Sequence, residues 1–374
     1  MRVLIVGSGI GGLAAGVAFS RVGAQADILE LRPNDETVGV GLNLPSNALR
    51  ALRSLGLLEK IEELGWHYQG IERYDQSGNL IDVFRPVNPS DVPFQISVTR
   101  ADLHSVLVDT ATSFGASITH GVTWTNLEEI PDGISVSRSD GKTGTYDLVV
   151  GADGIRSPLR RHLFGNSYEP VESGFGVWRM AVPRPPNQLL SEYWNGSAAK
   201  ATVLILNQRV MYLLVVERIP PGRKLDKSDY PSVLSSLLDG LGGIMPSIKE
   251  MLSEPQEIFF SPMEEVFLPS PWFKGRVVLI GDSAHACTPH LAQGAGMAME
   301  DALVLAELTT KGQNISTSLT EFMNRRFDRV KYVQESAHGI LQNEMEVDLE
   351  QKMLFSMRLG QLQQSITQRL AVPA

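Results

Sequence analysis

Three glycines near the start of the chain have the spacing that a diphosphate-binding turn requires. Gly7, Gly9 and Gly12 follow the apolar run Val3 to Val6, and small residues suited to close helix packing come directly after them. In such a turn the first glycine permits the sharp change of direction, the second lets the backbone approach a diphosphate, and the third lets helix and strand pack closely. Backbone N–H groups at the helix N-terminus then bind the anion. The motif therefore predicts a strand, a turn and a helix that hold a nucleotide.

An acidic residue follows at the position where such a unit recognises a ribose. Ala26 to Leu29 is typical of a second buried strand, and Glu30 at its end lies 18 residues beyond Gly12. A carboxylate at this place accepts hydrogen bonds from the ribose hydroxyls. Arg32 is interpreted either as a contact to the adenosine end or as a solvated surface residue.

A second motif, Tyr146 to Pro158, places an acid at the end of another apolar run. The predicted strand Leu148 to Val150 leads to Asp153, and Ser157 followed by Pro158 is typical of a helix start. Open α/β sheets bind ligands at the carboxyl ends of their strands. Asp153 is therefore a candidate ribose ligand, although an acid at this position can instead cap a turn.

A third motif, GRVVLIGDSAHACTPHLAQGAGMAMEDA, predicts a strand that ends at Gly281 and Asp282. A glycine loop then leads into a helix predicted from Met297 to Leu308, so its N-terminus presents N–H groups and a positive dipole end to an anion. His285 and His290 are candidates for catalysis or metal binding. Since no Cys or acidic ligands stand at metal spacing, we expect no metal site, and we interpret Cys287 as a buried small residue.

Arg100 opens the helix predicted from Thr99 to Ala111. A cation in the first turn of a helix is unfavourable for the helix dipole. We therefore expect this charge to serve a ligand, with a phosphate as the natural choice.

Other patterns predict the elements that must position these residues. We expect one helix over residues 46–65 with Ser46 as its N-cap, a hairpin tip at Ser77-Gly78-Asn79, and a further hairpin from strands over 117–124 and 133–138. Residues 172–269 alternate like antiparallel strands, with a hairpin tip at Asn207-Gln208 and mostly helix over 229–252. This region predicts a second domain whose sheet covers the first, which is a sensible place for a substrate pocket. The tail from Ser316 is predicted to be helical, including a Gln- and Met-rich run.

Composition bounds the class of protein. The chain has 374 residues, 43% of them apolar and 20% charged, which is ordinary for a globular protein of two domains or one elaborated α/β domain. Its net charge of −9 argues against a nucleic-acid surface. The single cysteine excludes an intrachain disulfide and fits a reducing compartment. With no apolar run long enough for a bilayer and no basic leader before the first strand, we expect a cytoplasmic location.

The three motifs together resemble the FAD-dependent class A aromatic hydroxylases, which have the para-hydroxybenzoate hydroxylase fold. GSGIGG is similar to the adenosine-diphosphate motif of that family, GADGIRSPLR to its internal DG motif, and GDSAHACTPHLAQGAGMAMEDA to its GD motif. The resemblance covers the nucleotide-binding parts of about three quarters of the chain. It is strongest to the salicylate, urate and hydroxynicotinate hydroxylase-like branch.

This resemblance implies an α/β fold in which a Rossmann-like FAD-binding domain is interleaved with a mostly antiparallel substrate-binding sheet. We expect residues 1–70, 99–168 and 270–310 in the FAD-binding domain, 71–98 and 169–269 in the substrate-binding domain, and 311–374 in a C-terminal helical segment. No second nicotinamide-binding unit is present, which agrees with transient use of NAD(P)H as co-substrate.

The resemblance also implies the cofactor residues. Gly7, Gly9 and Gly12 would hold the diphosphate of FAD, Glu30 the adenosine ribose, Arg100 the phosphate and ribityl region, and Asp282 the ribityl chain. Backbone N–H groups of the loop from Gly294 to Met297 would lie near the N1 and O2 edge of the flavin, where reduced flavin is negatively charged. Many relatives have Asn where this chain has Met297, so the resemblance assigns only a backbone role there. The full expected set is Gly7, Gly9, Gly12, Glu30, Arg32, Arg100, Val122, Asp153, Asp282, Pro289, Gly294, Ala295, Gly296 and Met297.

The expected activity is hydroxylation of a small aromatic or N-heteroaromatic substrate. NAD(P)H would reduce FAD, O₂ would add at C4a to give a hydroperoxide, and its distal oxygen would pass to an electron-rich ring. Tyr212 and His290 are candidates for activating the ring hydroxyl, and Arg179 for pairing with a substrate carboxylate. The alternatives are an epoxidase or a drug-modifying hydroxylase of the same fold, an oxidase or dehydrogenase, and a non-catalytic FAD-binding redox sensor. No nucleic-acid or membrane partner is expected, and the chain is expected to be a monomer or homodimer.

Overall fold

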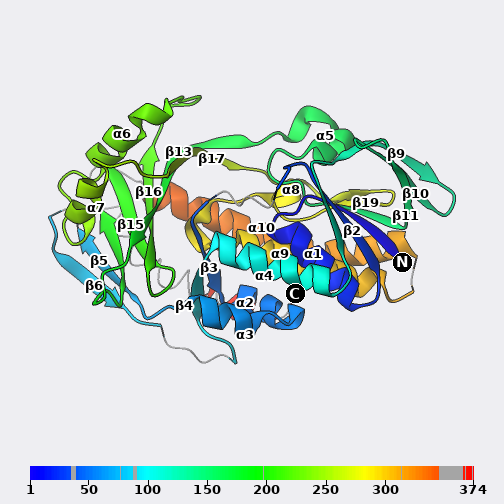
Figure 1. Ribbon diagram of the computed structural model, residues 1–374, viewed down its shortest axis with the longest axis horizontal. Helices are drawn as coiled ribbons and strands as arrows, with labels where there is room; N and C mark the ends of the chain where they lie inside the picture. Colours follow the sequence, from blue (N-terminus) through cyan, green and yellow to red (C-terminus); the bar gives the residue numbers. More distant parts are fainter. Residues whose placement is uncertain are drawn as a thin grey trace.

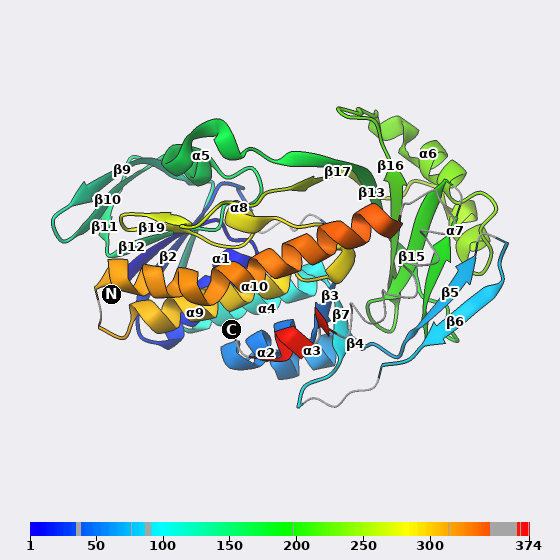
Figure 2. The same ribbon diagram turned by 180° about the vertical axis from the view of Figure 1, so that it is seen from behind.

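The computed structural model describes residues 1–34, 39–75, 77–86, 91–196, 198–312, 314–344, 365–366, 368–372 and 374. Two β-sheets lie at opposite ends of an elongated molecule, and long helices extend from one towards the other (Figures 1 and 2). The mixed α/β architecture expected from the sequence is confirmed.

The first of these, the parallel sheet, has the strand order β18-β19-β12-β1-β2-β8 and is parallel except for β18 at one edge. Its central strands are almost continuously apolar because both faces are covered. The bounds are β1 Arg2–Val6, β2 Gln25–Glu30, β8 Ser117–His120, β12 Leu148–Gly151, β18 Phe273–Lys274 and β19 Val277–Leu279.

A layer of long helices packs against the parallel sheet: α1 Ile10–Arg21, α4 Arg100–Ser113, α9 Gly294–Thr309 and α10 Ile315–Glu344. A Cβ on Gly16 would lie 2.7 Å from the Cδ1 atom of Ile28, so small residues in α1 permit its close approach to β2. A small antiparallel sheet follows the order β11-β10-β9, with β9 Trp124–Ile130, β10 Gly133–Arg138 and β11 Thr143–Tyr146. The short helices α5 Pro158–Phe164 and α8 Asp282–His285, and 3₁₀ turns at Gly165–Tyr168, Lys227–Asp229 and Pro289–Leu291, complete the connections.

The second large sheet, the mixed sheet, has the order β17-β13-β16-β15-β14-β5-β6 and is antiparallel except where β14 meets β5. Its bounds are β5 Ile71–Asp75, β6 Leu80–Phe84, β13 Val171–Pro183, β14 Ser191–Asn195, β15 Ala199–Ile205, β16 Val210–Arg218 and β17 Ile258–Glu265. Helices α6 Tyr230–Leu237 and α7 Met245–Met251 cover its outer face (Figure 1). Strands β13 and β17 run from this sheet back towards the parallel sheet in both ribbon views.

The predicted helix over residues 46–65 is wrong in one respect, because the chain forms two helices. Helix α2 spans Ser46–Leu55 and α3 spans Leu58–Leu64. Gly56 between them has φ of 77°, a left-handed conformation that ends α2 and that glycine adopts without strain. Pro45 is the N-cap and Ser46 is the first helical residue, so the predicted cap is also wrong. Nearby, β3 Gly41–Pro45, β7 Gln95–Thr99 and β4 Trp66–His67 form a small sheet in the order β3-β7-β4.

Two further predictions need correction. The hairpin after α4 is made by β9 and β10, whereas β8 pairs in parallel with β2 at the edge of the parallel sheet, where Ile118 packs against the core. The helix predicted to begin at Met297 begins at Gly294, so the glycine loop is itself the first turn of α9. The strands β1 and β2, the helix start at Ser157 and Pro158, and the tip between β15 and β16 are confirmed.

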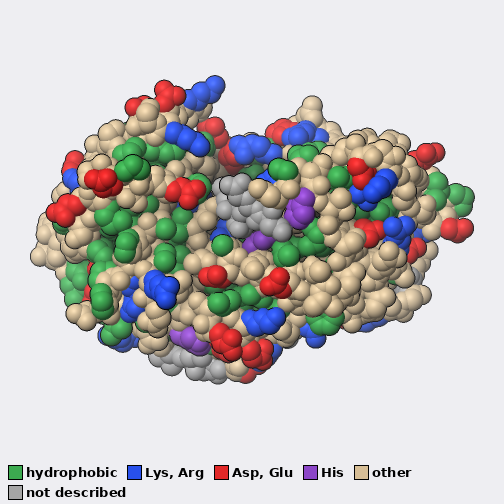
Figure 3. All heavy atoms as spheres, viewed as in Figure 1, with side chains coloured by type: hydrophobic (Ala, Val, Ile, Leu, Met, Phe, Trp, Pro, Cys, Tyr) green, Lys and Arg blue, Asp and Glu red, His purple; other side chains and the backbone are tan. Residues whose placement is uncertain are grey.

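The C-terminal residues that are described pack against α2 and α10. Arg50 and Arg329 both donate to the carbonyl oxygen of Leu370, at 2.7 and 3.2 Å. The predicted Gln- and Met-rich helical run falls on residues 345–364, which lie outside the described residues. In the part of the chain that is described, none of the helices combines the length and apolarity needed to cross a membrane. On the face drawn in Figure 3, basic and acidic side chains intermingle and do not gather into one basic surface.

Candidate active site

The three sequence motifs contribute four neighbouring strands that end at the same edge of the parallel sheet. Neighbouring strands β2, β1, β12 and β19 lead at their carboxyl ends to Glu30, Gly7, Asp153 and Asp282, respectively. Ligands of open α/β sheets bind at this edge. The structure therefore brings together residues that stand far apart in the sequence.

The glycine turn after β1 forms an open cradle. Gly7 has φ of 105°, and a Cβ there would lie 2.3 Å from the carbonyl oxygen of Ala152, so the turn requires glycine. Gly9 is the N-cap of α1, and a Cβ there would meet no atom within 4 Å. The first amides of α1 have no intrahelical acceptor. An anion can thus approach the backbone at Gly9 and bind these N–H groups.

Glu30 is buried and already organises this turn. One carboxylate oxygen accepts from the N–H and hydroxyl of Ser8, at 2.9 and 3.0 Å, and the other accepts from the N–H and Nε of Arg32, at 2.9 and 3.4 Å. Burial raises the pKa of Glu30, but these hydrogen bonds outweigh burial and hold its pKa below the ordinary value. Because a carboxylate has about four acceptor sites, a ribose would replace one of these donors. Val122 lies beside Glu30 and donates its N–H to the Glu30 carbonyl oxygen at 3.0 Å.

Asp153 acts as a cap in this structure. Its carboxylate accepts from the Ser157 hydroxyl at 2.5 Å and from the Leu159 N–H at 3.0 Å, so both oxygens serve the start of α5. Burial raises its pKa. The capping interpretation considered from the sequence is therefore the one that the geometry shows.

The GD motif presents two kinds of group. Asp282 is exposed at the start of α8, and the first amides of α9, at Gly294, Ala295 and Gly296, have no intrahelical acceptor. The Met297 N–H, in contrast, donates to the Gln293 carbonyl oxygen at 2.8 Å. The Met297 side chain is buried in the core, which explains why its identity does not bear on the cofactor edge.

Arg100 is the first residue of α4, and its side chain lies near groups of both the GD motif and the mixed sheet. A Cβ on Gly39 would lie 3.2 Å from its Cδ atom, so glycine makes room for the side chain. Burial lowers the pKa of Arg100, and the nearby carboxylate of Asp282 opposes that effect, while Arg179 and Tyr212 are also close enough to act on it. The cation predicted to serve a ligand therefore faces the other candidate residues.

The face of the mixed sheet opposite α6 and α7 carries the substrate candidates. Tyr212 pairs with Ala181 across β13 and β16, and Arg179 lies diagonally from it on the same face. Arg179 hydrogen-bonds to Tyr212 and donates to the Ser261 hydroxyl at 3.1 Å. Burial raises the pKa of Tyr212 despite the opposing guanidinium, so the phenol is neutral at physiological pH.

Lys200 shares this face, and the sequence analysis missed it. It alternates along β15 with Ala199 and Ala201, which pack on the opposite side under α6 and α7, and its Nζ lies 5.7 Å from the centre of the Tyr193 ring. Burial and Lys200 together lower the pKa of His290 to about 3, so His290 is a neutral imidazole. The available signal was a lysine at an internal position of β15, in a strand that is otherwise apolar except for Thr202.

Charge is divided between the two faces of the mixed sheet. Under α6 and α7, Glu72, Glu192 and Glu217 accept hydrogen bonds from Tyr74, Trp194 and Trp178, respectively. Arg179 and Lys200 lie on the other face, towards the cofactor edge. The face opposite α6 and α7, called the inner face below, therefore carries these two cationic side chains.

One candidate from the sequence, His285, lies away from the open edge. His285 is buried against Trp272 and bonds through Nε2 to Asp301 at 2.6 Å, away from the open edge. Burial raises the pKa of Cys287 to about 12, so its thiol is protonated at physiological pH.

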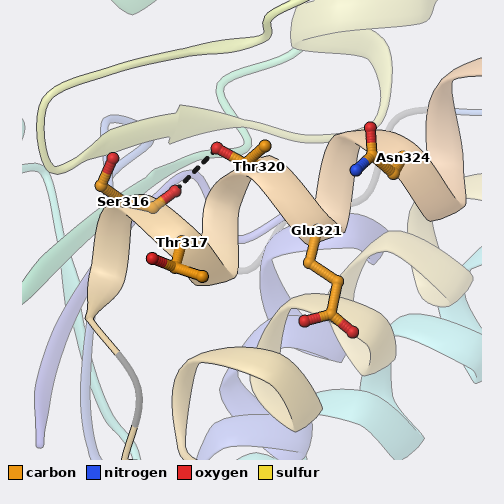
Figure 4. Close-up of a pocket in the computed structure, with 5 residues that line it drawn as sticks. All are labelled: Ser316, Thr317, Thr320, Glu321 and Asn324. Atoms are coloured by element: carbon orange, nitrogen blue, oxygen red, sulfur yellow. Dashed lines mark hydrogen bonds between the residues drawn. The ribbon is translucent and has the colours of Figure 1, made fainter.

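A depression at the start of α10, lined by Ser316, Thr317, Thr320, Glu321 and Asn324, lies near the N-terminus at the far edge of the parallel sheet (Figure 4).

Comparison with known proteins agrees with this arrangement. A family model described as "FAD binding domain" matches residues 1–337. A putative FAD-dependent monooxygenase of Bacillus subtilis is 29% identical over 347 residues, which are 92% of this chain and 94% of the relative. The 2-heptyl-3-hydroxy-4(1H)-quinolone synthase of Pseudomonas aeruginosa is 32% identical over 344 residues, 90% of this chain and 88% of the relative. The crystal structure of a Klebsiella pneumoniae protein with FAD and uric acid superposes with a TM-score of 0.89 at 22% identity, covering 99% and 97% of the chains.

The fold and the edge described above define a flavoprotein of the class A hydroxylase architecture, as the three motifs predicted. The chain belongs to the FAD-binding-domain family, and FAD is its cofactor. The residues present fit that group: the Gly9 cradle is open, Asp282 is exposed, and the buried Thr288 hydroxyl, directly before the turn at Pro289–Leu291, has no hydrogen-bond partner among the described residues.

Proposed function

We propose that this protein is a monooxygenase that uses NAD(P)H and O₂ to hydroxylate an electron-rich aromatic or N-heteroaromatic ring. FAD, once reduced by NAD(P)H, supplies the activation of O₂ and the transfer of one oxygen atom. The observation that carries the proposal is the meeting of Arg100, Arg179, Tyr212 and Asp282 between the cofactor edge and the inner face of the mixed sheet. The names of the two relatives, a putative monooxygenase and a hydroxyquinolone synthase, support the same chemistry.

The chain would hold FAD mainly through backbone groups. The amides that follow Gly9 would bind the diphosphate, Glu30 and Arg32 with Val122 would contact the adenosine end, and Arg100 and Asp282 would contact the phosphate and ribityl region. The first amides of α9, next to Pro289, would face the flavin edge that becomes negative on reduction. Preorganised N–H groups at such a position stabilise charge without rearranging. Asp153 would act indirectly, by fixing the start of α5.

The substrate would lie on the inner face of the mixed sheet. Arg179 would pair with an anionic or strongly polarised group of the ring system, since Arg179 and Lys200 make this face cationic. The neutral Tyr212 phenol would donate a hydrogen bond to the ring oxygen, and this bond would favour the ionised form of that oxygen. The neutral His290 would line the substrate site and form hydrogen bonds there. It would not act as a base, because its pKa is about 3.

We propose the corresponding division of the chain. Residues 1–70, 99–168 and 270–310 would form the FAD-binding domain, and residues 71–98 and 169–269 the substrate-binding domain, with a C-terminal helical segment over 311–374. Support comes from the strands: the parallel sheet draws on the first set, and the mixed sheet on the second. Strand β7 is the exception, because it pairs with β3 and β4.

We also propose a cytoplasmic monomer or homodimer. The lone Cys287 agrees with a reducing compartment. Size-exclusion chromatography with light scattering measures the oligomeric state, and a tetramer would contradict this proposal.

The decisive experiment measures NADH and NADPH oxidation by the purified holoenzyme against hydroxylated aromatic acids, N-heteroaromatic acids and 4-quinolones. Hydroxylated product and hydrogen peroxide are measured in the same samples. Substrate-stimulated oxidation with product equal to the NAD(P)H consumed is the expected result. Peroxide without product for every stimulating compound would favour an oxidase, and no stimulation by any compound would favour a non-catalytic flavoprotein.

A further inference from the structure

A buried ion-pair network lies behind the two segments proposed to face the flavin. Arg326 of α10 is fully buried, and it donates from Nε to Asp301 at 2.7 Å and from Nη1 to Glu300 at 2.6 Å. Arg329, one turn later, binds both oxygens of Glu300 at 2.7 Å. Two arginines of α10 thus neutralise two consecutive acids in α9.

The second oxygen of Asp301 reaches the GD motif. It accepts from the Gly281 N–H at 3.0 Å and from His285 Nε2 at 2.6 Å. Gly281 directly precedes Asp282, the proposed ribityl ligand. One carboxylate therefore connects the guanidinium of Arg326 to the turn that presents Asp282.

The same guanidinium also reaches the first turn of α9. Its Nη2 donates to the Met297 carbonyl oxygen at 3.2 Å. On the other side of α9, Asn47 and Gln293 exchange two amide hydrogen bonds, at 2.8 and 3.0 Å, and Asn47 also donates to Glu300 at 3.3 Å. The helix start whose N–H groups face the cofactor edge is therefore tied to both α2 and α10.

The network compensates the negative charges of Glu300 and Asp301. Buried ion pairs are often no more stabilising than apolar residues of the same volume, whereas removal of one partner leaves an uncompensated buried charge. Without a counter-ion, Glu300 and Asp301 would place two negative charges close behind amides that should favour an anion. Burial raises the pKa of Asp301, but His285 and Arg326 outweigh burial and keep it ionised.

We propose that Arg326 is a positioning residue for the flavin, which acts through Asp301 to hold the Asp282 turn and the first turn of α9 together and cancels the charge behind them. This inference rests on the proposed placement of FAD. It adds a role for α10, which contributes no residue to the expected cofactor set.

The test compares three conservative variants of α10. Arg326→Lys keeps the charge but loses the fork that binds Asp301, Glu300 and the Met297 carbonyl at once. Arg329→Lys disturbs the same network only on the Glu300 side. Arg325→Lys is the matched control, because Arg325 pairs with Glu307 on the surface. Asp301→Asn, which keeps the side-chain shape, tests the same tie in case Arg326→Lys gives no folded apoprotein.

Three quantities are measured on each protein: unfolding of the apoprotein in urea, the FAD dissociation constant by flavin fluorescence, and the two-electron reduction potential by dye-linked titration. Arg326→Lys should weaken FAD binding at least tenfold. It should also lower the potential by about 30 mV or more, which is a tenfold loss in relative stabilisation of reduced FAD. Arg325→Lys should change neither the FAD dissociation constant nor the relative stabilisation of reduced FAD by more than about twofold. Arg329→Lys should lower apoprotein stability and shift the potential less than Arg326→Lys does.

A purely structural role gives a different pattern. If Arg326→Lys and Asp301→Asn lower only apoprotein stability, or if Arg329→Lys shifts the potential as much as Arg326→Lys, the inference is overturned. A wild-type protein that binds FAD but hydroxylates nothing would contradict the proposed function and would not affect this inference. A wild-type protein that binds no FAD would contradict both the proposed function and this inference.

Discussion

A Cβ atom on Gly12 would lie 1.9 Å from the carbonyl oxygen of Gly7, whereas a Cβ on Gly9 would meet no atom within 4 Å. The two glycines of one motif therefore have separable roles. Gly12 lets α1 pack against the turn after β1, and Gly9 leaves open space in which we propose that the diphosphate binds.

Alanine substitutions should separate these roles. Gly12→Ala should destabilise the apoprotein by about 1–3 kcal/mol, because the Gly7 carbonyl belongs to the backbone and cannot move aside cheaply. Gly9→Ala should leave apoprotein stability within about 0.5 kcal/mol but weaken FAD binding at least tenfold. Urea unfolding and flavin fluorescence measure the two effects. Equal losses of stability in both variants would contradict the assignment.

Glu30 should make the stability of the apoprotein depend on pH in the acidic range. Its folded-state pKa lies below the ordinary value of 4.5. The ionised Glu30 therefore adds to the free energy of unfolding above pH 4.5, and this stabilisation is lost as the pH falls through the folded-state pKa. Glu30→Gln should cost about 1 kcal/mol at pH 7 and should flatten the decline below about pH 4.5. Urea unfolding at a series of pH values measures this, with Glu128→Gln on the exposed side of β9 as the control. A steeper acid decline in Glu30→Gln would exclude the assigned role.

His290 should produce a pH dependence at higher pH. Its pKa in the folded protein is about 3, whereas the ordinary value is 6.5. As the pH falls below about 6.5, the unfolded chain therefore binds a proton that the folded protein does not bind. This difference lowers the free energy of unfolding as the pH decreases. His290→Asn should remove this dependence, which is at most about 1.4 kcal/mol per pH unit. Unfolding at pH 7.5 and 5.5 provides the test, and the exposed His67, changed to Asn, is the control. An identical decline in wild type and His290→Asn would show that His290 is not held neutral.

Tyr212 and Arg179 should affect turnover without affecting FAD binding. Tyr212→Phe removes the phenol that hydrogen-bonds to Arg179, and it should lower kcat/KM about 10²-fold for the best substrate. Arg179→Gln should raise KM for carboxylate-bearing substrates about tenfold or more, because a charged hydrogen bond is lost. Arg184→Gln, which removes a guanidinium that stacks on Trp66, is the control. Unchanged kinetics in both inner-face variants would place the substrate elsewhere.

Local sequence signals were sufficient for much of the fold and part of the site. The strand, turn and helix around Gly7, the helix start at Ser157 and Pro158, and the tip between β15 and β16 depend on residues within a few positions of one another, so local reasoning found them. The same reasoning failed at Gly56, where a left-handed glycine divides an otherwise continuous helical pattern. It also misassigned β8, because the partner of a strand is not encoded in its own alternation.

By itself the sequence determined that the chain has a nucleotide-binding turn, two further strand-end motifs and an architecture that interleaves them with a second sheet. Only the tertiary structure decided how the side chains are used: Asp153 caps α5, Met297 packs into the core, and Lys200 joins Arg179 on the inner face. It also brought Arg326 to Asp301, 25 residues earlier in the chain and buried beneath the GD turn. The physical reason is that spacing along the chain specifies local backbone geometry, whereas partners for buried charges depend on which helices and strands pack together.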